Sequence, residues 1–490
     1  MSEGTQRATI LEALATGLAH HQRGEMPQAE SIYRQILAAD SRNADALHLL
    51  GVLALNTNRV SDAISLIEQA IAVAPNQGVY YSNLGSAYLS ACRNDEARAL
   101  LDHAIRLSPE LANAHYNLAV ALYNLGRLDE SVASYRRALD VDPTDVRTHN
   151  NLGNLFLEMG RLDESLFHLE EALKLDPQCA SALYNRSLGW LKQGRLPEGW
   201  QAYESRWLCP GFTKRETTQP AWNGAPIPGQ TLLVHAEQGL GDTIQFIRYL
   251  PMVRTRCSNV IVEVQPGLLP LFQQSGIRGL VAQHTLTPPF DIQLPMASLP
   301  GAFGTTWPTI PRDGPYLLAK PDLVNHWRQA LSQFTGFKVG IVWQGSPTYR
   351  EDRYRSIPLP YFAALARVPG VQLISLQKGQ GTEQIAMLRN QFHVLDLGSR
   401  LDERAGPFMD CAAIMKCLDL VISADTVTVH LAGALGVKAW AALRIGADWR
   451  WPIGHEWSPW YPTVRMFRQR SFNDWPGVFS EMADELQRLV

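Results

Sequence analysis

A glycine-rich turn that ends in a carboxylate is the first feature of this sequence that could do chemistry. The stretch HAEQGLGDTIQ, residues 235–245, follows the short apolar run TLLV. Gly239 and Gly241 permit a tight turn and the close approach of a ligand to the backbone. Asp242 stands at the start of the expected helix that follows. It fits a helix capping box, so structure by itself could account for this aspartate.

A second strand, turn and helix start lies in ISADTVTVHLAGALGVKAW, residues 422–440. The amino end of a helix offers free N–H groups and the positive end of the helix dipole, which together favour a bound anion. Asp425, Thr426, Val427 and His430 lie at that helix start. In the alternative interpretation, Asp425 only caps the helix and His430 is an ordinary buried helix residue.

Two further turns follow apolar runs and bring amide and basic side chains to strand ends. Gln344 lies in VGIVWQGSPTYREDRYRSIPL, and Gln377 and Lys378 lie in LISLQKGQG. Basic side chains at strand ends can neutralise phosphate groups. A solvated loop explains most charges of YREDRYR, so Arg353 and Lys378 are the two cations that we expect in a site.

The first two motifs carry a resemblance to a known family. HAEQGLGDTIQ resembles the strand–turn–helix opening of the heptosyltransferase-type glycosyltransferases of family 9. The second motif closely resembles the donor-site pattern of that family, D-T/S-x-x-x-H-L-A-x-A-x-G. The matching positions are Asp425, Thr426, His430, Leu431, Ala432, Ala434 and Gly436.

The resemblance covers about residues 220–490 and implies a role for each motif. Asp242 would be the general base that takes the proton of an acceptor hydroxyl, with Glu237 as the reserve candidate. Gln238, Gly239 and Gly241 would form the acceptor-side loop. The amides of Thr426 and Val427 would hold the diphosphate of a nucleotide sugar, and His430 would face the pyrophosphate or the sugar. Since no D-x-D motif follows a strand, we expect neither a metal nor another cofactor.

The elements that position these motifs are expected to form two α/β domains. The apolar runs TLLVHA, VIVEV, KVGIVW, VQLISL and LVISA alternate with helical stretches, which indicates parallel sheets buried on both faces. We assign residues 230–318 to an acceptor domain and residues 319–490 to a donor domain, both Rossmann-like. Their strand ends would enclose a cleft, as in the GT-B fold. The proline- and glycine-rich residues 209–229 are expected to be a linker.

The region before this linker is a repeat array. Pro75, Pro109, Pro143 and Pro177 follow one another at a constant step of 34 residues. The stretch ANAHYNLAVALYNLGRLDESVASYRRALDVDP resembles the tetratricopeptide repeat, so we expect an all-α solenoid over residues 1–208, with five full repeats and a degenerate sixth. Its groove would bind a protein or peptide, and a rigid spacer or a dimerisation arm is the alternative.

Composition excludes several classes of partner and site. The 490 residues carry a net charge of −3, which gives no reason to expect nucleic acid or an anionic membrane as the main partner. No run approaches the ~20 apolar residues of a transmembrane helix, and the amino terminus has no signal-peptide pattern. We therefore expect a cytoplasmic protein. Six scattered cysteines favour reduced thiols over disulfides or zinc.

Together these features predict a metal-independent, inverting glycosyltransferase that transfers a hexose or heptose from a nucleotide sugar to a hydroxyl acceptor. The combination with repeats is similar to that of the O-linked N-acetylglucosamine transferases, so we expect a protein acceptor presented by the repeats. Two alternatives stay open, namely a glycolipid or polysaccharide acceptor and an inactive repeat scaffold. The sequence leaves the sugar, the nucleobase and self-association into a homo-oligomer undecided.

Overall fold

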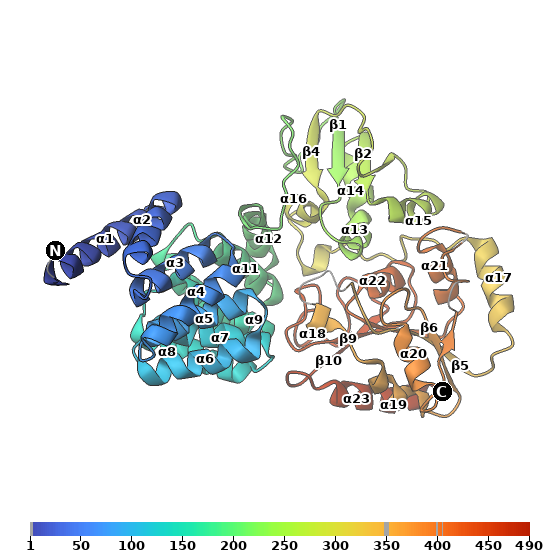
Figure 1. Cartoon of the computed structure of the whole chain (residues 1–490). Helices are drawn as coiled ribbons and strands as arrows, with labels where there is room; N and C mark the ends of the chain where they lie inside the picture. The colour runs from blue at the N-terminus through green and yellow to red at the C-terminus, as the bar shows by residue number, and fades with distance from the viewer. Residues whose placement is uncertain (1–2, 347–351, 398–399, 404) are drawn as a thin grey trace. The chain divides into compact units, whose positions relative to one another are not determined.

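The computed structural model of the chain divides into two compact units (Figure 1). It describes residues 3–346, 352–397, 400–403 and 405–490. Unit 1 comprises Met1–Leu155 and Phe167–Cys179, and unit 2 comprises Phe156–Leu166 and Ala180–Val490. Each unit has apolar clusters of its own.

Unit 1 is a series of antiparallel helix pairs, which confirms the predicted repeat solenoid. The helices, of which the last two cross into unit 2, are α1 (Glu3–Gln22), α2 (Met26–Ala39), α3 (Ala44–Asn56), α4 (Val60–Val73), α5 (Gly78–Ser90), α6 (Asn94–Leu107), α7 (Ala112–Asn124), α8 (Leu128–Val141), α9 (Val146–Glu158) and α10 (Leu162–Leu175). From α3 onward, the first helix of each pair begins at the 34-residue step read from the sequence.

Small residues let the two helices of a repeat approach closely. A Cβ atom on Gly85 of α5 would lie 2.6 Å from the Leu101 side chain of α6. Ala97 and Ala104 of α6 are fully buried. Pro109 follows α6, where a residue without an N–H group cannot continue the helix. The repeated glycine, alanine and proline positions therefore set the shape of each helix pair.

The last two repeat helices, α11 (Ala180–Lys192) and α12 (Leu196–Tyr203), belong to unit 2 together with the short 3-10 helix η1 (Glu204–Leu208). Leu191, Leu196 and Trp200 are buried in the same core as Trp449, far along the chain. The repeat pattern thus continues to about residue 208, whereas the division between compact units falls inside the fifth repeat.

Two parallel sheets follow, as predicted for an α/β region. The first has the order β3-β2-β1-β4, with β1 (Thr231–His235), β2 (Asn259–Val264), β3 (Leu280–Ala282) and β4 (Ile292–Pro295). Strand β1 pairs with both neighbours in parallel, since Val234 aligns with Val262 on one side and Leu294 on the other. The helices of this lobe are α13 (Leu240–Phe246), α14 (Leu250–Arg256), α15 (Leu269–Gln274) and α16 (Leu299–Ala302), with the 3-10 turns η2 (Ile247–Tyr249), η3 (Pro266–Leu268), η4 (Met296–Ser298) and η5 (Trp307–Thr309).

The second sheet has the order β10-β9-β8-β5-β6-β7, and all of its pairings are parallel. Its strands are β5 (Phe337–Val342), β6 (Val371–Ser375), β7 (Leu395–Asp396), β8 (Leu420–Ala424), β9 (Ala439–Leu443) and β10 (Val464–Arg468). The helical elements of this lobe are α17 (Pro321–Leu331), α18 (Asp352–Arg355), η6 (Leu359–Phe362), α19 (Ala363–Ala366), α20 (Glu383–Leu388), α21 (Met409–Met415), α22 (Val427–Ala434) and α23 (Trp475–Leu489). Every residue of β8 is buried, as expected for a central parallel strand.

The segment expected to be a linker, residues 209–229, is irregular but partly fixed on the first sheet. Ala221 forms an isolated parallel bridge with Gln293 of β4. The neighbouring Trp222 is buried, and its backbone N–H donates to the Gln293 carbonyl oxygen at 2.8 Å. This part of the segment therefore extends the edge of the sheet.

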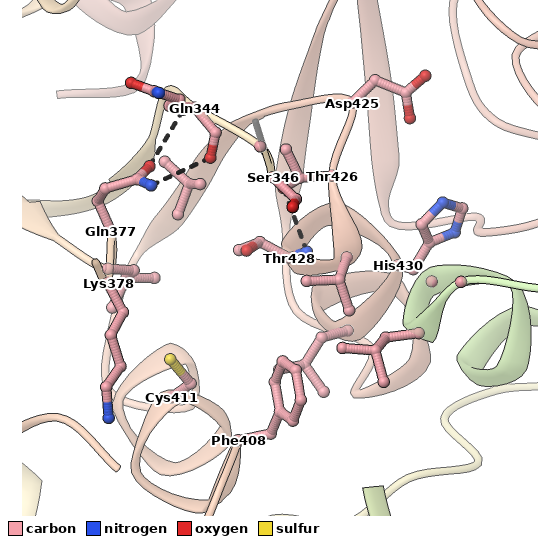
Figure 2. Close-up of a pocket in the computed structure, with 18 of the residues that line it drawn as sticks. Gln344, Ser346, Gln377, Lys378, Phe408, Cys411, Asp425, Thr426, Thr428 and His430 are labelled. Carbon is pink, nitrogen blue, oxygen red and sulfur yellow. Dashed lines mark hydrogen bonds between the residues drawn. The ribbon is translucent and has the colours of Figure 1, made fainter. Parts of the chain in front are cut away.

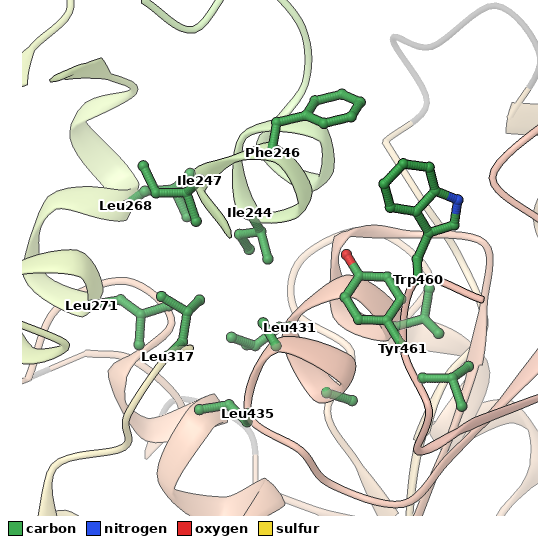
Figure 3. Close-up of a cluster of buried hydrophobic side chains, with 14 of the residues drawn as sticks. Ile244, Phe246, Ile247, Leu268, Leu271, Leu317, Leu431, Leu435, Trp460 and Tyr461 are labelled. Carbon is green, nitrogen blue, oxygen red and sulfur yellow. The ribbon is translucent and has the colours of Figure 1, made fainter. Parts of the chain in front are cut away.

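The two lobes share one apolar core (Figure 3). Ile244 and Phe246 of α13 face a cluster that contains Leu431 of α22 and Trp460. At the contact a Cβ atom on Gly241 would lie 2.8 Å from the His430 ring, so the close approach of the two helices needs glycine there. This contact holds the two chemically interesting motifs side by side.

Within the described part of the chain, no helix is both long enough and apolar enough to cross a bilayer.

Candidate functional site

A cavity of about 870 Å³ lies in unit 2, where the carboxyl ends of strands from both sheets meet. The turn after β1 contributes Gly239, Gly241 and Asp242, and the turn after β8 contributes Asp425 and Thr426. Residues after β5 and β6 complete this part of the lining. The structure therefore brings the four predicted turns to one site.

Asp242 has two sets of contacts at the start of α13. Its Oδ2 accepts a hydrogen bond from the Gly239 backbone N–H at 2.9 Å, as a capping box requires. Its Oδ1 accepts one from Nη2 of Arg450 at 2.5 Å. Burial raises the pKa of the Asp242 carboxyl, and the Arg450 guanidinium opposes this rise. The Asp242 side chain thus both caps α13 and lines the cavity.

Arg450, which the sequence did not single out, is the central cation of the site. Its side chain is only 7% exposed, and Nη1 donates to Asp448 Oδ1 at 2.7 Å. The guanidinium also lies over the Trp449 ring, 4.1 Å from the ring centroid. Burial opposes the charge of Arg450, but Asp448 and Asp242 outweigh it and raise the pKa of the arginine. The stretch ADWRW drew attention only through its tryptophans, because no motif marks an aspartate and an arginine two residues apart.

The amino end of α22 faces the cavity as predicted from the sequence. Thr426 is the N-cap residue, and its Oγ1 accepts from the Thr428 N–H at 3.4 Å. Thr426, Val427 and Thr428 all line the cavity. Asp425 is not the cap, since its Oδ1 accepts from Trp451 Nε1 at 2.8 Å. Burial raises the pKa of Asp425.

His430 lines the cavity one turn into α22 (Figure 2). Its Nδ1 lies 3.0 Å from the Tyr461 hydroxyl oxygen. Burial lowers the pKa of His430 to about 3, and the positive charge of Arg450 adds to this effect. The imidazole is therefore neutral at pH 7 and offers a hydrogen bond rather than a charge.

Gln377 lines the cavity, but its side-chain amide forms hydrogen bonds with the protein backbone (Figure 2). Its Oε1 accepts from the N–H groups of Trp343 at 3.2 Å and Gln344 at 3.1 Å. Its Nε2 donates to the carbonyl oxygens of Gln344 and Gln380, both at 3.1 Å. Gln377 thus fixes the turn that carries Gln344, which also lines the cavity.

Of the two predicted cations, Lys378 and Arg353, Lys378 has a described side chain. Lys378 lines the cavity, and its Nζ donates to the Leu401 carbonyl oxygen at 2.9 Å and to Glu403 at 3.0 Å. The side chain of Arg353, in α18, lies outside the described part of the structure. Arg355, from the same helix, and Arg444 line the cavity, and neither was chosen from the sequence.

Glu237 and Gln238, the other two loop residues, do not belong to the described lining of the cavity. Glu237 accepts from the backbone N–H groups of Met296 at 3.0 Å and Ala297 at 3.2 Å. Burial raises the pKa of Glu237 to about 7. Of the two carboxylates considered as the base, Asp242 therefore belongs to the described lining of the cavity and Glu237 does not.

The repeat region matches models of a known protein family. Models of the tetratricopeptide repeat family match residues 20–88, 93–126, 110–178 and 150–211. The chain therefore contains tetratricopeptide repeats. Repeats of this kind indicate a role in protein interaction.

One curated relative and several solved structures are similar to parts of the chain. Protein FlbA of Caulobacter vibrioides is 28% identical over 320 residues, which is 59% of this chain and 52% of FlbA. The chain thus spans about half the length of this relative. TTC0263, a thermophilic TPR protein of Thermus thermophilus, is 24% identical and covers 37% of this chain and 99% of its own, with a TM-score of 0.34. YrrB, a TPR protein with an unusual peptide-binding site, is 21% identical and covers 36% of this chain and 91% of its own, with a TM-score of 0.30.

Proposed function

We propose that the α/β region is a metal-independent, inverting glycosyltransferase module of the GT-B type. One observation carries this proposal: a carboxylate on one lobe and the amino end of a helix on the other line the same cavity. The carboxylate, Asp242, suits a proton acceptor. The helix start at Thr426 suits the diphosphate of a nucleotide sugar.

On the donor side, the diphosphate lies against the first turn of α22. The N–H groups of Thr426 and Val427 lie at the start of α22, where the helix dipole is positive, and both residues line the cavity. Arg355 and Arg444 line the same cavity and supply positive charge for a leaving nucleoside diphosphate. Neutral His430 donates or accepts a hydrogen bond to the diphosphate or the sugar. A cavity of about 870 Å³ is within the range of small-ligand sites.

On the acceptor side, Asp242 takes the proton of the attacking hydroxyl. The new bond forms between the hydroxyl oxygen and the anomeric carbon while the bond from that carbon to the diphosphate oxygen breaks, so the configuration inverts. Burial, which raises the pKa of Asp242, makes its carboxylate a stronger base. A base of this kind contributes ~10²–10⁴-fold in rate.

The acceptor that we propose is a protein bound by the repeats, because tetratricopeptide repeats indicate a role in protein interaction. The sequence similarity to Protein FlbA identifies no acceptor. An acceptor in a glycolipid or polysaccharide, with the repeats serving assembly, is the alternative that acceptor screening distinguishes.

The first test is calorimetric binding of a panel of nucleoside diphosphates and their sugars to the full chain. We expect selective binding of one nucleotide class, and His430→Ala should weaken it at least about tenfold. Asp425→Ala tests the neighbouring position, where loss of the Trp451 hydrogen bond should also weaken donor binding. A folded protein that binds no member of a broad panel would favour the inactive scaffold.

Asp242→Asn then tests the proton acceptor. Asparagine keeps the side-chain oxygen that accepts from Gly239, so the helix cap survives. We expect turnover with the identified donor to fall by ~10²-fold or more while the donor Kd stays within about threefold. Unchanged turnover in Asp242→Asn contradicts the assignment of the base.

A further inference from the structure

The segment formed by α12 and η1, at the end of the repeat array, lies against the loop that precedes Asp242. This loop comprises residues 237–239. Arg206 and Tyr203 of the repeat segment both reach it. Each contact is within unit 2.

The first contact joins the buried side chain of Arg206 to Glu237 of the loop. Its side chain is fully buried, and Nη2 donates to Ser298 Oγ at 2.7 Å and to Glu237 Oε1 at 3.4 Å. Nη1 donates to Glu204 at 2.7 Å. Since Glu237 is itself bound to the backbone N–H groups of Met296 and Ala297, this cluster ties the loop to η4 as well as to the repeat segment. A buried arginine without these partners would be strongly destabilising.

Tyr203 forms the second contact, one residue further along the loop. The Gln238 amide nitrogen donates to the Tyr203 hydroxyl at 3.0 Å, and the hydroxyl donates back to the Gln238 amide oxygen at 3.3 Å. From the other side, Gln265 Nε2 donates to the Gln238 carbonyl oxygen at 2.9 Å. The next residue, Gly239, donates its N–H to Asp242.

The same repeat helix also contacts the loop that carries Arg450. The Trp200 ring lies edge-on to the Trp449 ring, with the centroids 5.0 Å apart. The Tyr203 ring contacts Trp449 at a centroid distance of 6.4 Å. Trp449 is the stacking partner of Arg450. Side chains of α12 therefore contact the loop before Asp242 and also Trp449, the residue before Arg450.

We propose that Arg206 and Tyr203 are positioning residues, which hold loop 237–239 so that Asp242 meets Arg450 at the cavity. Neither side chain belongs to the described lining, so each acts through the loop. The catalytic consequence rests on the proposed function, because it needs Asp242 as the base. The last repeat is then a component of the site and more than an attached binding arm.

Hydrogen exchange of the full chain tests the loop independently of activity. The variants are Tyr203→Phe, which removes only the hydroxyl, and Arg206→Met. Ser205→Ala is the matched control, because the Ser205 hydroxyl lies in the same segment but donates within it, to the Ala202 carbonyl oxygen. We expect amide exchange in peptides covering residues 237–243 to speed up at least tenfold in both variants and to stay within twofold in the control. Arg206→Lys, which keeps the charge, should restore part of the protection.

Kinetics with the donor identified by calorimetry supply the second readout. Tyr203→Phe should lower kcat at least fivefold and leave the donor Kd within twofold, since the donor motif lies on the other lobe. If Arg206→Met fails to fold, Tyr203→Phe alone decides. Unchanged exchange in Tyr203→Phe overturns the proposal whether or not the protein is active. Absence of any transfer by the wild-type protein, with faster exchange in Tyr203→Phe, overturns the proposed function and leaves the positioning role supported.

Discussion

Asp242 makes two hydrogen bonds of different kinds, and each accounts for one role that its residue type allowed. The bond from the Gly239 N–H is local and follows from the capping pattern. The bond from Arg450 spans more than two hundred residues of sequence. Burial raises the pKa of Asp242, and the charge of Arg450 opposes this rise.

A first prediction concerns pH and Arg450→Gln. The charged groups that act on Asp242 are Arg450 and Asp448, and the titratable side chains of Glu237 and Tyr203 interact with it as well. Burial raises the pKa of Asp242 and Arg450 lowers it, so removing the arginine charge leaves the rise unopposed. Because the reaction needs the carboxylate, activity should appear only at higher pH. The acid limb of the kcat/KM profile should move up by roughly 1–3 pH units.

Arg450→Lys is the control for this prediction, because lysine keeps the charge but loses the planar fork. Its acid limb should lie between those of the wild-type protein and Arg450→Gln. An acid limb at the wild-type pH in Arg450→Gln would show that Arg450 does not govern the protonation of Asp242.

At the scale of elements, a glycine allows a repeat helix and the loop after β9 to approach closely. The carboxyl end of α9 approaches the loop after β9 so closely that a Cβ atom on Gly446 would overlap the Glu158 carbonyl oxygen. Two polar contacts join this loop to the repeat helices α9 and α11. Arg444 donates to the Glu158 carboxylate, and Lys192 Nζ donates to the Gly446 carbonyl oxygen at 3.1 Å. The loop that carries Arg444 and Arg450 is thus supported from the repeat side.

The second prediction is that Gly446→Ala destabilises unit 2. The added methyl group has no free space and should cost ~1–3 kcal/mol in the free energy of unfolding. The measurement is guanidinium-induced unfolding followed by tryptophan fluorescence. Gly267→Ala is the control, since a Cβ atom there meets only Pro407 at 3.9 Å and should change the free energy by less than ~0.5 kcal/mol. Equal stability of the two variants would contradict the close approach.

At the scale of the whole molecule, the repeats do not end where the α/β region begins. Helices α11 and α12 follow the repeat pattern, yet they are counted in unit 2. Trp200 is only 4% exposed and Tyr203 only 3% exposed, and both are buried against the α/β region. The α/β region therefore depends on the last repeat helices for part of its core.

The third prediction compares two truncations. Removing residues 1–142 keeps α9 to α12 and should leave a cooperative thermal transition. Removing residues 1–208 deletes Leu191, Leu196, Trp200 and Tyr203 from the core, and each such loss costs ~2–5 kcal/mol. Since domains are stable by only ~5–15 kcal/mol, the shorter protein should not fold. Circular dichroism melts of both proteins check this, and a stable fold after the longer deletion would contradict the shared core.

Much of the fold was predictable because it depends on local pattern. The 34-residue step of Pro75, Pro109 and Pro143 repeats a helix pair whose contacts are close in sequence. The apolar runs that became β1, β5 and β8 were recognisable because strands buried on both faces carry few polar residues. The helix start near Thr426 followed from the strand–turn–helix pattern, although Thr426 and not Asp425 is the N-cap residue of α22. The four predicted turns line one cavity, as expected for turns at the carboxyl ends of parallel strands.

The remaining features depend on which distant residues meet, and no local pattern encodes that. The sequence alone determined the repeats and the parallel sheets, because helix and strand periodicity act over a few neighbouring residues. It pointed to Asp242 as a candidate base only through the resemblance of its motif to a known family. Only the tertiary structure decided that Arg450 pairs with Asp242, that Glu237 lies outside the described lining of the cavity, and that Arg206 contacts Glu237. Each is a buried charge, and burial fixes a charged side chain to whichever partner the packing of remote elements supplies.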